Sequence, residues 1–281
     1  MKFEKRSMGA TVDVSSGNQG SWSLVKTIAK YLVVFVALFI ALTLIADHAV
    51  SMMPDSWERR LASSLSPPAP RPPQTEEPSP FSFLRKTVTS EDLERVKKIK
   101  TKLMEGRRWR ELDYEVDIAE WGMGPNAFAT LGGRVTVTPE LLDVLKTEEG
   151  LAFIIAHELA HHEHRHVLKT NTKNLAVGLV FLTIGATAGE GLISSSTTLP
   201  LLASNRSMEE EADAFAANLI CEKYGSVQNI DEFFVWVQEN DPHSKWLTWT
   251  STHPHPESRL DMVRKFASKC TRGKPAGLTS P

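Results

Sequence analysis

The hydrophobic pattern divides the chain into a long apolar stretch near its start and a later region of mixed periodicity. Residues 28–46, IAKYLVVFVALFIALTLIA, carry one charge, Lys30, which lies near enough to their start for its ammonium group to reach the membrane surface. Nineteen helical residues span about 29 Å, close to the roughly 30 Å of a hydrocarbon core. The stretch therefore predicts an uncleaved transmembrane anchor. The alternative is a cleaved signal peptide, whose polar leader is normally shorter.

The charges that flank the apolar stretch predict its orientation. Positive residues precede it or lie at its start, and they are Lys2, Lys5, Arg6, Lys26 and Lys30. The first charge after it is acidic, Asp47. By the positive-inside rule the N-terminus is cytoplasmic and the rest of the chain lies across the membrane, in the periplasm of a bacterium. The alternative is the mitochondrial inner membrane, but the N-terminus lacks the Arg-rich composition of a transit peptide.

Composition suggests how the remaining chain is organised. The N-terminal segment is polar and rich in Gly and Ser, and SPPAPRPPQTEEPSP holds seven of the sixteen prolines, typical of a polyproline-II spacer. We predict a disordered tail over 1–27, the anchor over 28–46, a Pro-rich linker over 47–85, a folded domain over 86–270 and a flexible tail over 271–281.

The periodicity after residue 86 predicts a mainly helical α+β domain. TSEDLERVKKIKTKLMEG begins with a capping residue, Thr89 or Ser90, and continues with apolar residues at helical spacing. YEVDIA is typical of a strand, and NAFATLGGRVTVTP of a hairpin that turns at its two glycines. We expect a small antiparallel sheet, then a helix opened by Pro139 and one long helix from Glu148 to Lys169.

Charge and cysteine content narrow the function only slightly. The net charge of −2 and the absence of a zinc-finger or RNA-binding signature exclude any argument for nucleic acid as a partner. The two cysteines, Cys221 and Cys270, either form one bridge in an oxidising compartment or stay reduced.

The predicted long helix contains HELAHHEHRH, which holds five of the nine histidines. His157 and His161 are four residues apart, so both imidazoles project from one helix face and can reach one metal ion. The spacing H-E-x-x-H is typical of zinc metalloproteases, in which zinc activates a water and a carboxylate takes its proton. Glu158 has the position of that carboxylate. The plain alternative is a solvated helix whose histidines bind nothing.

A second helical pattern, NRSMEEEADAFAANLI, offers a third ligand. Glu209 and Asp213 are four residues apart and therefore share a helix face. Glu209 can bind the zinc, and Asp213 can hold a ligand histidine through its other ring nitrogen. Glu210 and Glu211 are expected to be solvated. The alternative is an ordinary acidic helix N-terminus.

Four blocks together resemble the membrane-associated gluzincin zinc metallopeptidases, which include HtpX, the CAAX prenyl protease and BepA-like enzymes. The blocks are PNAFATLGGRVTVT, HELAHHEHRH, RSMEEEADAFA and STHPHPESRL, in the family's order. Because one clear span precedes them, the chain is most similar to the BepA-like branch and to the mitochondrial inner-membrane stress protease. The resemblance implies a zincin fold.

The resemblance also implies a role for each matching residue. One zinc ion per chain would bind His157, His161 and Glu209, with Glu158 as the base. His253 would stabilise the oxyanion or bind zinc as an inhibitory fourth ligand, and both alternatives stay open. Supporting and substrate-binding residues complete the set: Asp213 and Arg259 beside the ligands, and Asn126, Ala127 and Phe128 on a strand that would pair with an extended peptide.

The remaining histidines and a second apolar run lie outside this assignment. His162 and His166 are expected to face away from the ligand stripe, and the family pattern makes His166 a structural hydrogen-bonding residue. Leu175–Ala188 is short for a membrane crossing, and we interpret it as a helical hairpin or a lid.

The preferred hypothesis is a membrane-anchored zinc endopeptidase. Its partners would be unfolded or membrane-proximal polypeptides, and membrane lipid through residues 28–46. One alternative is a chaperone-like or assembly factor with a structural or latched zinc site. Another is a metal-buffering histidine cluster, which would depend on His162, His164 and His166 rather than on Glu158.

Overall fold

The chain forms two compact units, Met1–Ala46 and Asp47–Pro281, each described by itself. The computed structural model describes residues 17–65, 87–120, 124–173, 206–240, 253 and 256–270. The proline-rich run 66–80 and the apolar run Leu175–Ala188 lie outside these residues.

Helix α1, Gly17–Met52, contains the predicted anchor. Most of its large apolar side chains are exposed, among them Tyr31, Val33 and Leu44. Within the described ranges no helix combines the length and the apolar composition needed to cross a membrane. The anchor over residues 28–46 stays a prediction.

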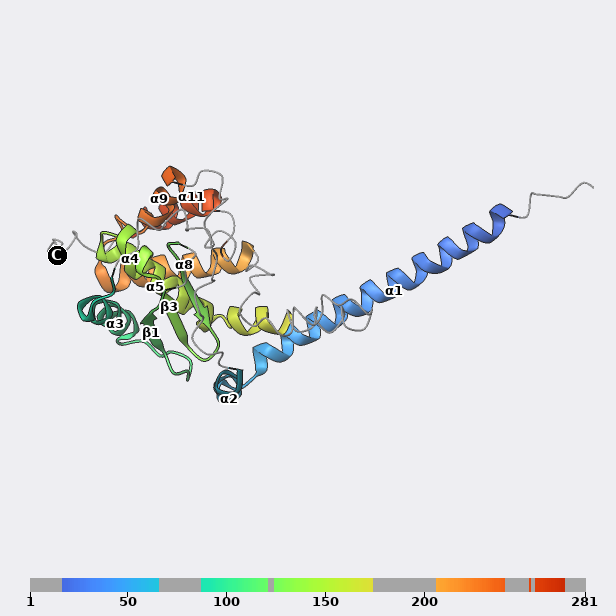
Figure 1. Ribbon diagram of the computed structural model, residues 1–281, viewed down its shortest axis with the longest axis horizontal. Coiled ribbons are helices and arrows are strands. Elements are labelled where there is room, and N and C mark those ends of the chain that lie inside the picture. Colours follow the sequence, from blue (N-terminus) through green and yellow to red (C-terminus); the bar gives the residue numbers. More distant parts are fainter. Residues whose placement is uncertain are drawn as a thin grey trace, which may run out of the picture. The chain divides into compact units, whose positions relative to one another are not determined.

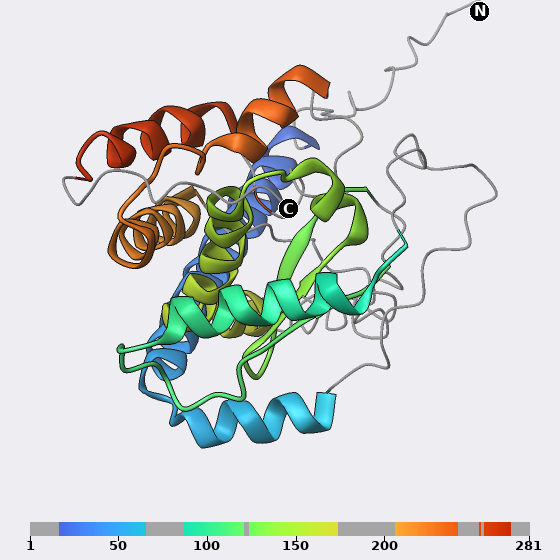
Figure 2. The same ribbon diagram turned by 90° about the vertical axis from the view of Figure 1, so that its left-hand side faces the viewer.

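The second unit is mainly helical with one small sheet, which confirms the α+β class (Figure 1). Its described elements, in chain order, are α2 Asp55–Leu65, α3 Ser90–Met104, β1 Glu115–Ile118, β2 Ala127–Thr130, β3 Arg134–Val137, α4 Pro139–Val144, α5 Glu148–Glu163, α8 Arg206–Tyr224, α9 Glu232–Asn240 and α11 Pro256–Ala267. Helices α9 and α11 lie at the end of this unit opposite α2 in both views (Figure 2).

The sheet is mixed, so the prediction of an antiparallel sheet is wrong for one strand. The predicted hairpin is present: β2 runs antiparallel to β3, and both turn residues, Gly132 and Gly133, have positive φ. Strand β1 runs parallel to β3, with Val116 opposite Val135. The reason is the strand order β1-β3-β2: β1 pairs with β3 instead of with β2, its neighbour in the sequence. Because the chain reverses direction in the hairpin between β2 and β3, β3 runs in the same direction as β1.

Local capping starts the helices where the sequence predicts them. Thr89 caps α3 in a reciprocal capping box with Asp92, and Thr138 caps α4 with Pro139 in its first turn. At α5 the cap is Thr147, whose hydroxyl donates to Glu232 at the start of α9. That carboxylate therefore sits at the positive end of the α5 dipole.

Helix α5 is the centre of the domain, since every residue from Glu149 to His162 is buried. It ends at Glu163, so the predicted continuous helix to Lys169 is wrong. Arg165 adopts a left-handed φ of 58°, and the chain is helical again over residues 166–173. The break is stabilised because the carbonyl of His162 accepts bonds from the Arg165 N–H (3.0 Å) and from the Arg110 guanidinium (2.5 Å).

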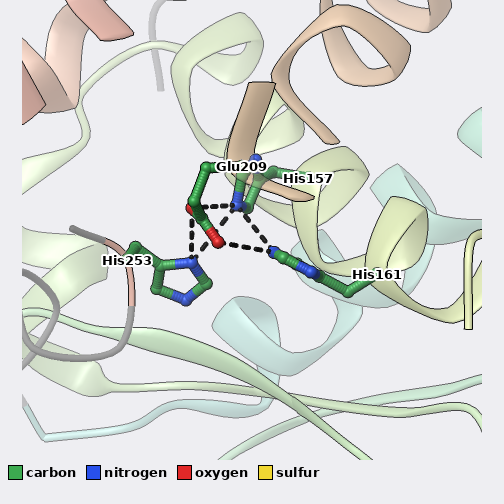
Figure 3. Close-up of side chains that lie close together, drawn as sticks. All are labelled: His157, His161, Glu209 and His253. Carbon is green, nitrogen blue, oxygen red and sulfur yellow. Dashed lines mark hydrogen bonds and ion pairs between the residues drawn. The ribbon is translucent and has the colours of Figure 1, made fainter. Parts of the chain in front are cut away.

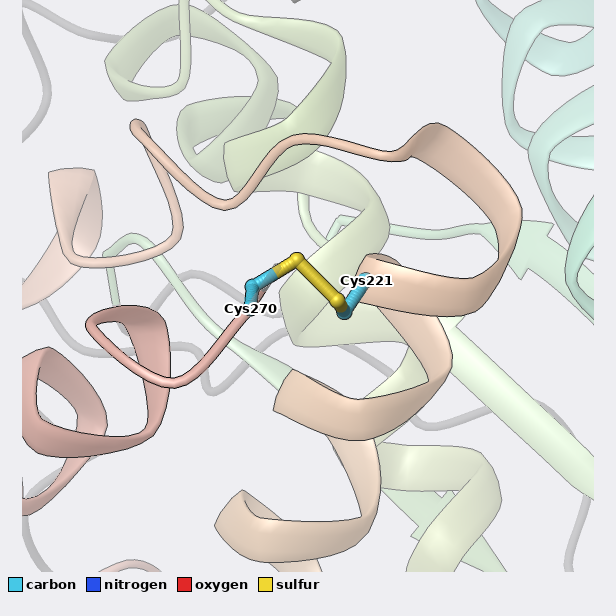
Figure 4. The surroundings of a disulfide bond; sticks show 2 residues. All are labelled: Cys221 and Cys270. Carbon is cyan, nitrogen blue, oxygen red and sulfur yellow. A yellow bond between two sulfur atoms is a disulfide. The ribbon is translucent and has the colours of Figure 1, made fainter. Parts of the chain in front are cut away.

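A disulfide joins Cys221 in α8 to Cys270 after α11 (Figure 4). The structure thus shows the two cysteines paired, one of the two alternatives left open by the sequence. Because α8 and α11 pack against each other, the bridge closes a loop of 49 residues around an existing contact.

We expect the double substitution Cys221→Ser/Cys270→Ser to lower the free energy of unfolding by about 2–4 kcal/mol, because the open chain gains loop entropy. Urea denaturation of the full chain in detergent, followed by circular dichroism, measures the change. Wild type treated with a reductant is the matched control and should unfold at the midpoint of the variant. An unchanged midpoint in the variant would show that the bridge stabilises nothing.

Candidate metal centre

Four side chains from three separate segments of the chain meet where helices α5 and α8 pack side by side (Figure 3). His157 and His161 come from α5, Glu209 from α8 and His253 from the segment before α11. One ligand atom from each lies within 4.8 Å of the others, and all four residues are buried. This is the one such group among the residues that the structure describes.

The three predicted ligands converge closely. The Nε2 atoms of His157 and His161 are 3.0 Å apart. Glu209 Oε2 lies 3.3 Å from the first of these nitrogens, and Glu209 Oε1 lies 3.5 Å from the second. Within the described part of the chain Glu209 Oε1 is buried without a hydrogen bond. Two imidazole nitrogens and a carboxylate oxygen that face one point fit a zinc ion with one position open.

Without a metal, the pKa values of the two histidines shift in opposite directions. Burial, together with the charge of His157, lowers the pKa of His161 well below its usual value, so this imidazole is neutral. Burial also opposes charge on His157, but hydrogen bonds to Asp213 and Glu209 outweigh it and raise its pKa to about 9. A metal cation at this point would take the place of the proton on His157.

Asp213 and Arg259 hold the ligands from behind. Asp213 Oδ1 lies 2.9 Å from His157 Nδ1, on the ring edge opposite the convergence point. The guanidinium of Arg259 donates two 2.8 Å bonds to Asp213 and lies 2.7 Å from Glu209 Oε2. Burial raises the pKa of Asp213, but the charge and hydrogen bonds of Arg259 outweigh burial and lower it. Both carboxylates are therefore ionised.

A second chain of contacts reaches His161. Its Nδ1 lies 3.1 Å from His166 Nδ1, and His166 Nε2 lies 3.2 Å from Glu211 Oε2. If His166 donates Nε2–H to the carboxylate, its Nδ1 accepts from His161, which leaves the lone pair of His161 Nε2 for a metal. Glu211 is exposed, as expected, but it also pairs with His164 and His166, which the sequence did not predict.

His162 and Glu210 lie outside the cluster. The His162 Nε2 atom is 3.1 Å from the carbonyl of Arg134 in β3, and burial lowers the pKa of this histidine to about 4. A neutral His162 thus fastens α5 to the hairpin. Glu210 forms an exposed pair with Arg206 in its own helix.

Glu158 is buried beside the ligands. Neither of its oxygens has a hydrogen bond among the described residues, and the Nε2 atom of His253 lies 3.4 Å from Glu158 Oε1. Burial raises the pKa of Glu158, which favours proton uptake by this carboxylate. The other ring nitrogen of His253, Nδ1, lies 3.0 Å from Glu209 Oε2.

The three residues predicted to bind substrate lie at the start of β2. Asn126 and Ala127 are buried and Phe128 is half-buried. Asn126 donates its N–H to Thr138 Oγ1 (2.8 Å), and β2 packs against α5. In the described sheet β2 is an edge strand, paired on one side with β3.

Comparison with known proteins gives a consistent picture. Residues 90–267 match the profile of peptidase family M48. The mitochondrial metalloendopeptidase OMA1 of Schizosaccharomyces pombe is 30% identical over 50% of this chain and 43% of its own length. The beta-barrel assembly-enhancing protease of Yersinia pestis is 28% identical over 51% of this chain and 32% of its own length. A protease HtpX homolog of Acidiphilium cryptum is 34% identical over 51% of this chain and 64% of its own length. The chain spans less than half the length of the first two relatives.

We expect Glu211→Gln to weaken zinc binding about tenfold, because the neutral amide no longer fixes the His166 tautomer that orients His161. The neighbouring Glu210→Gln makes the same chemical change outside the network and should leave the affinity unchanged. Competition with a chromophoric chelator measures both constants. Equal affinities in the two variants would exclude a role for Glu211 in metal binding.

Proposed function

Because the chain belongs to peptidase family M48, we propose that it is a membrane-tethered zinc endopeptidase that hydrolyses peptide bonds of misfolded or membrane-proximal proteins. The single observation that carries the proposal is the convergence of His157, His161 and Glu209, with the buried carboxylate of Glu158 one residue from the first ligand. A structural zinc site would not need this additional carboxylate, whose oxygens have no hydrogen bond among the described residues.

Each residue of the centre has a distinct task in this proposal. Zinc, when bound, supplies the Lewis acidity that activates a water for attack on a peptide carbonyl. Glu158 takes the proton of that water and delivers it to the leaving amine. His253 lies 3.4 Å from Glu158 and can donate to the oxygen of the attacked carbonyl. Arg259 and Asp213 keep Glu209 and His157 in place.

The edge strand supports an extended peptide as the substrate. Strand β2 packs against α5, which carries two of the ligands, and its outer edge pairs with no described strand. A peptide added to this edge would be held through its backbone, with little side-chain selection. Such recognition suits misfolded proteins of varied sequence. Asn126, Ala127 and Phe128 would form the contact.

Two observations support a site of action across a membrane. The exposed apolar side chains of α1 favour lipid as their surroundings. The disulfide between Cys221 and Cys270 favours an oxidising compartment. With the N-terminus cytoplasmic, the proposed location of the catalytic domain is the bacterial periplasm, and the mitochondrial inner membrane is the alternative.

The position of His253 favours a second candidate, a latched form. Its Nδ1 lies 3.3 Å from His157 Nε2 and belongs to the group of four possible ligand atoms. If His253 occupies the fourth position on zinc, water cannot bind there, and the protein would act as a chaperone-like or assembly factor.

The experiment that tests the proposal compares wild type with Glu158→Gln as full chains in lipid nanodiscs, with fluorescently labelled unfolded casein as substrate. We expect wild type to cleave casein, a chelator to stop cleavage, and Glu158→Gln to retain zinc while losing about 100-fold or more of the rate. Glu210→Gln is the matched control and should cleave like wild type. Equal cleavage by Glu158→Gln and wild type would contradict the assignment of the base.

His253→Ala distinguishes the two candidates. If His253 assists the reaction, its removal should slow cleavage about 10²–10³-fold, as expected for one lost oxyanion donor. If His253 is a latch, wild type should bind zinc without cutting casein and His253→Ala should cut it. The same casein assay, together with the zinc content of wild type and His253→Ala, distinguishes the two roles of His253.

A further inference from the structure

Helix α2 lies in the segment predicted to be a Pro-rich linker, yet its inner face is bound to the catalytic domain by ion pairs. Glu58 is buried, and its Oε2 lies 2.5 Å from Arg110. Asp55 accepts bonds from Arg110 (2.8 Å) and from Arg165 (2.9 Å), and also from the backbone N–H of Glu111 (2.8 Å). The pairing of buried Glu58 with Arg110 fixes the geometry here, since loss of one partner would leave the other uncompensated.

The same helix is held at a second point. Ala62 packs directly on the turn of the β2–β3 hairpin, where a Cβ on Gly132 would lie only 2.6 Å from the Ala62 methyl. Arg110 also binds the carbonyl of His162 at the end of α5. Direct contacts therefore join α2 to the hairpin and to the helix that carries His157 and His161.

The outer face of α2 has the composition of a membrane-surface helix. Four exposed residues recur at helical spacing, namely Trp57, Arg60, Leu61 and Ser64. Trp57 is 61% exposed and Leu61 is 39% exposed. Trp is enriched at the headgroup level of bilayers, and Arg beside it attracts anionic lipid. The acidic residues of the helix, Asp55 and Glu58, lie on the inner face instead.

The position of α2 in the chain supports the same partner. Met52, the last residue of α1, lies six positions after Ala46, the end of the predicted span, and at 1.5 Å per residue the helix rises about 9 Å between them. The headgroup layer on each side of a bilayer is roughly 5–8 Å thick. Only Met53 and Pro54 then precede α2. The chain therefore cannot carry α2 far from the bilayer surface.

We propose that α2 lies in the lipid headgroup layer through Trp57, Arg60 and Leu61 and so docks the catalytic domain on the membrane. The inference rests on the anchor in the proposed function. It adds that the domain does not move freely on a spacer. Instead, the ion pairs of Asp55 and Glu58 transmit a fixed height and orientation to α5. The favoured substrates are then polypeptide segments at the membrane surface.

Site-directed spin labelling of the full chain in nanodiscs of phosphatidylethanolamine and phosphatidylglycerol tests the proposal. One label is placed by Trp57→Cys or Leu61→Cys, and the matched control is Lys265→Cys, an exposed position on α11 at the opposite end of the unit. Power saturation compares collisions with oxygen and with a water-soluble nickel chelate. We expect an oxygen-to-nickel ratio several-fold higher at 57 and 61 than at 265.

Equal ratios at positions 57, 61 and 265 would overturn the proposal, and so would protection of 57 and 61 from both collision partners, which indicates a protein contact. A further label, Val33→Cys, reports the predicted anchor separately. A lipid-like ratio at 33 with a water-like ratio at 57 would overturn docking and leave the tethered peptidase standing. A water-like ratio at position 33 would show that the predicted anchor does not lie in the bilayer, and would overturn both the anchor and the docking that rests on it. Zinc binding by each labelled protein verifies that it is folded.

Discussion

The bidentate pairing of Arg259 with Asp213 is the interaction on which the centre depends. Arg259 is almost completely buried, and its guanidinium binds Asp213 and Glu209 on α8 from its own position on α11. Asp213 in turn contacts His157 on α5. A buried cation between two carboxylates is stable only if all partners are present, because each uncompensated charge would cost several kcal/mol. Three helices are therefore held in one register by the same charges that orient the ligands.

This arrangement explains why both ligand histidines have polar partners on the ring edge away from the convergence point. His157 is held by an aspartate that is locked by arginine, and His161 by a histidine that contacts the half-exposed Glu211. The contacts that hold His157 are fully buried, whereas those that hold His161 extend to the exposed Glu211. Placing His166 there depends on the helix break, since Arg165 in the left-handed conformation redirects the chain just after α5. Local backbone geometry and ligand orientation are thus linked at one point.

The parts of the fold that sequence could predict are those with local causes. Thr89 caps α3, Pro139 stands in the first turn of α4, two glycines make the hairpin turn, and i, i+4 spacing puts His157 and His161 on one face. A second helical pattern offered Glu209 as a third ligand, and the family resemblance added Arg259, which no local rule connects to the histidines.

The parts that sequence could not predict depend on contacts between distant residues. The parallel pairing of β1 with β3 follows from strand order, which the hydrophobic pattern does not contain. The end of α5 at Glu163 has no glycine or proline signal and depends on Arg110, more than fifty residues away. Glu211 looks like its neighbours in an acidic run, and only packing separates it from Glu210. Helix α2 was not predicted, because its large apolar side chains, Trp57 and Leu61, are exposed and its inner face is held by ion pairs.

Zinc K-edge X-ray absorption of the purified full chain tests the central claim most directly, because it reports the ligands without reference to activity. The account predicts stoichiometric zinc with two imidazole nitrogens and a carboxylate oxygen at about 2.0–2.2 Å, and one further nitrogen or oxygen. His161→Ala should remove one imidazole contribution from the spectrum. A chain that binds no zinc, or a spectrum that is unchanged in His161→Ala, would contradict the account.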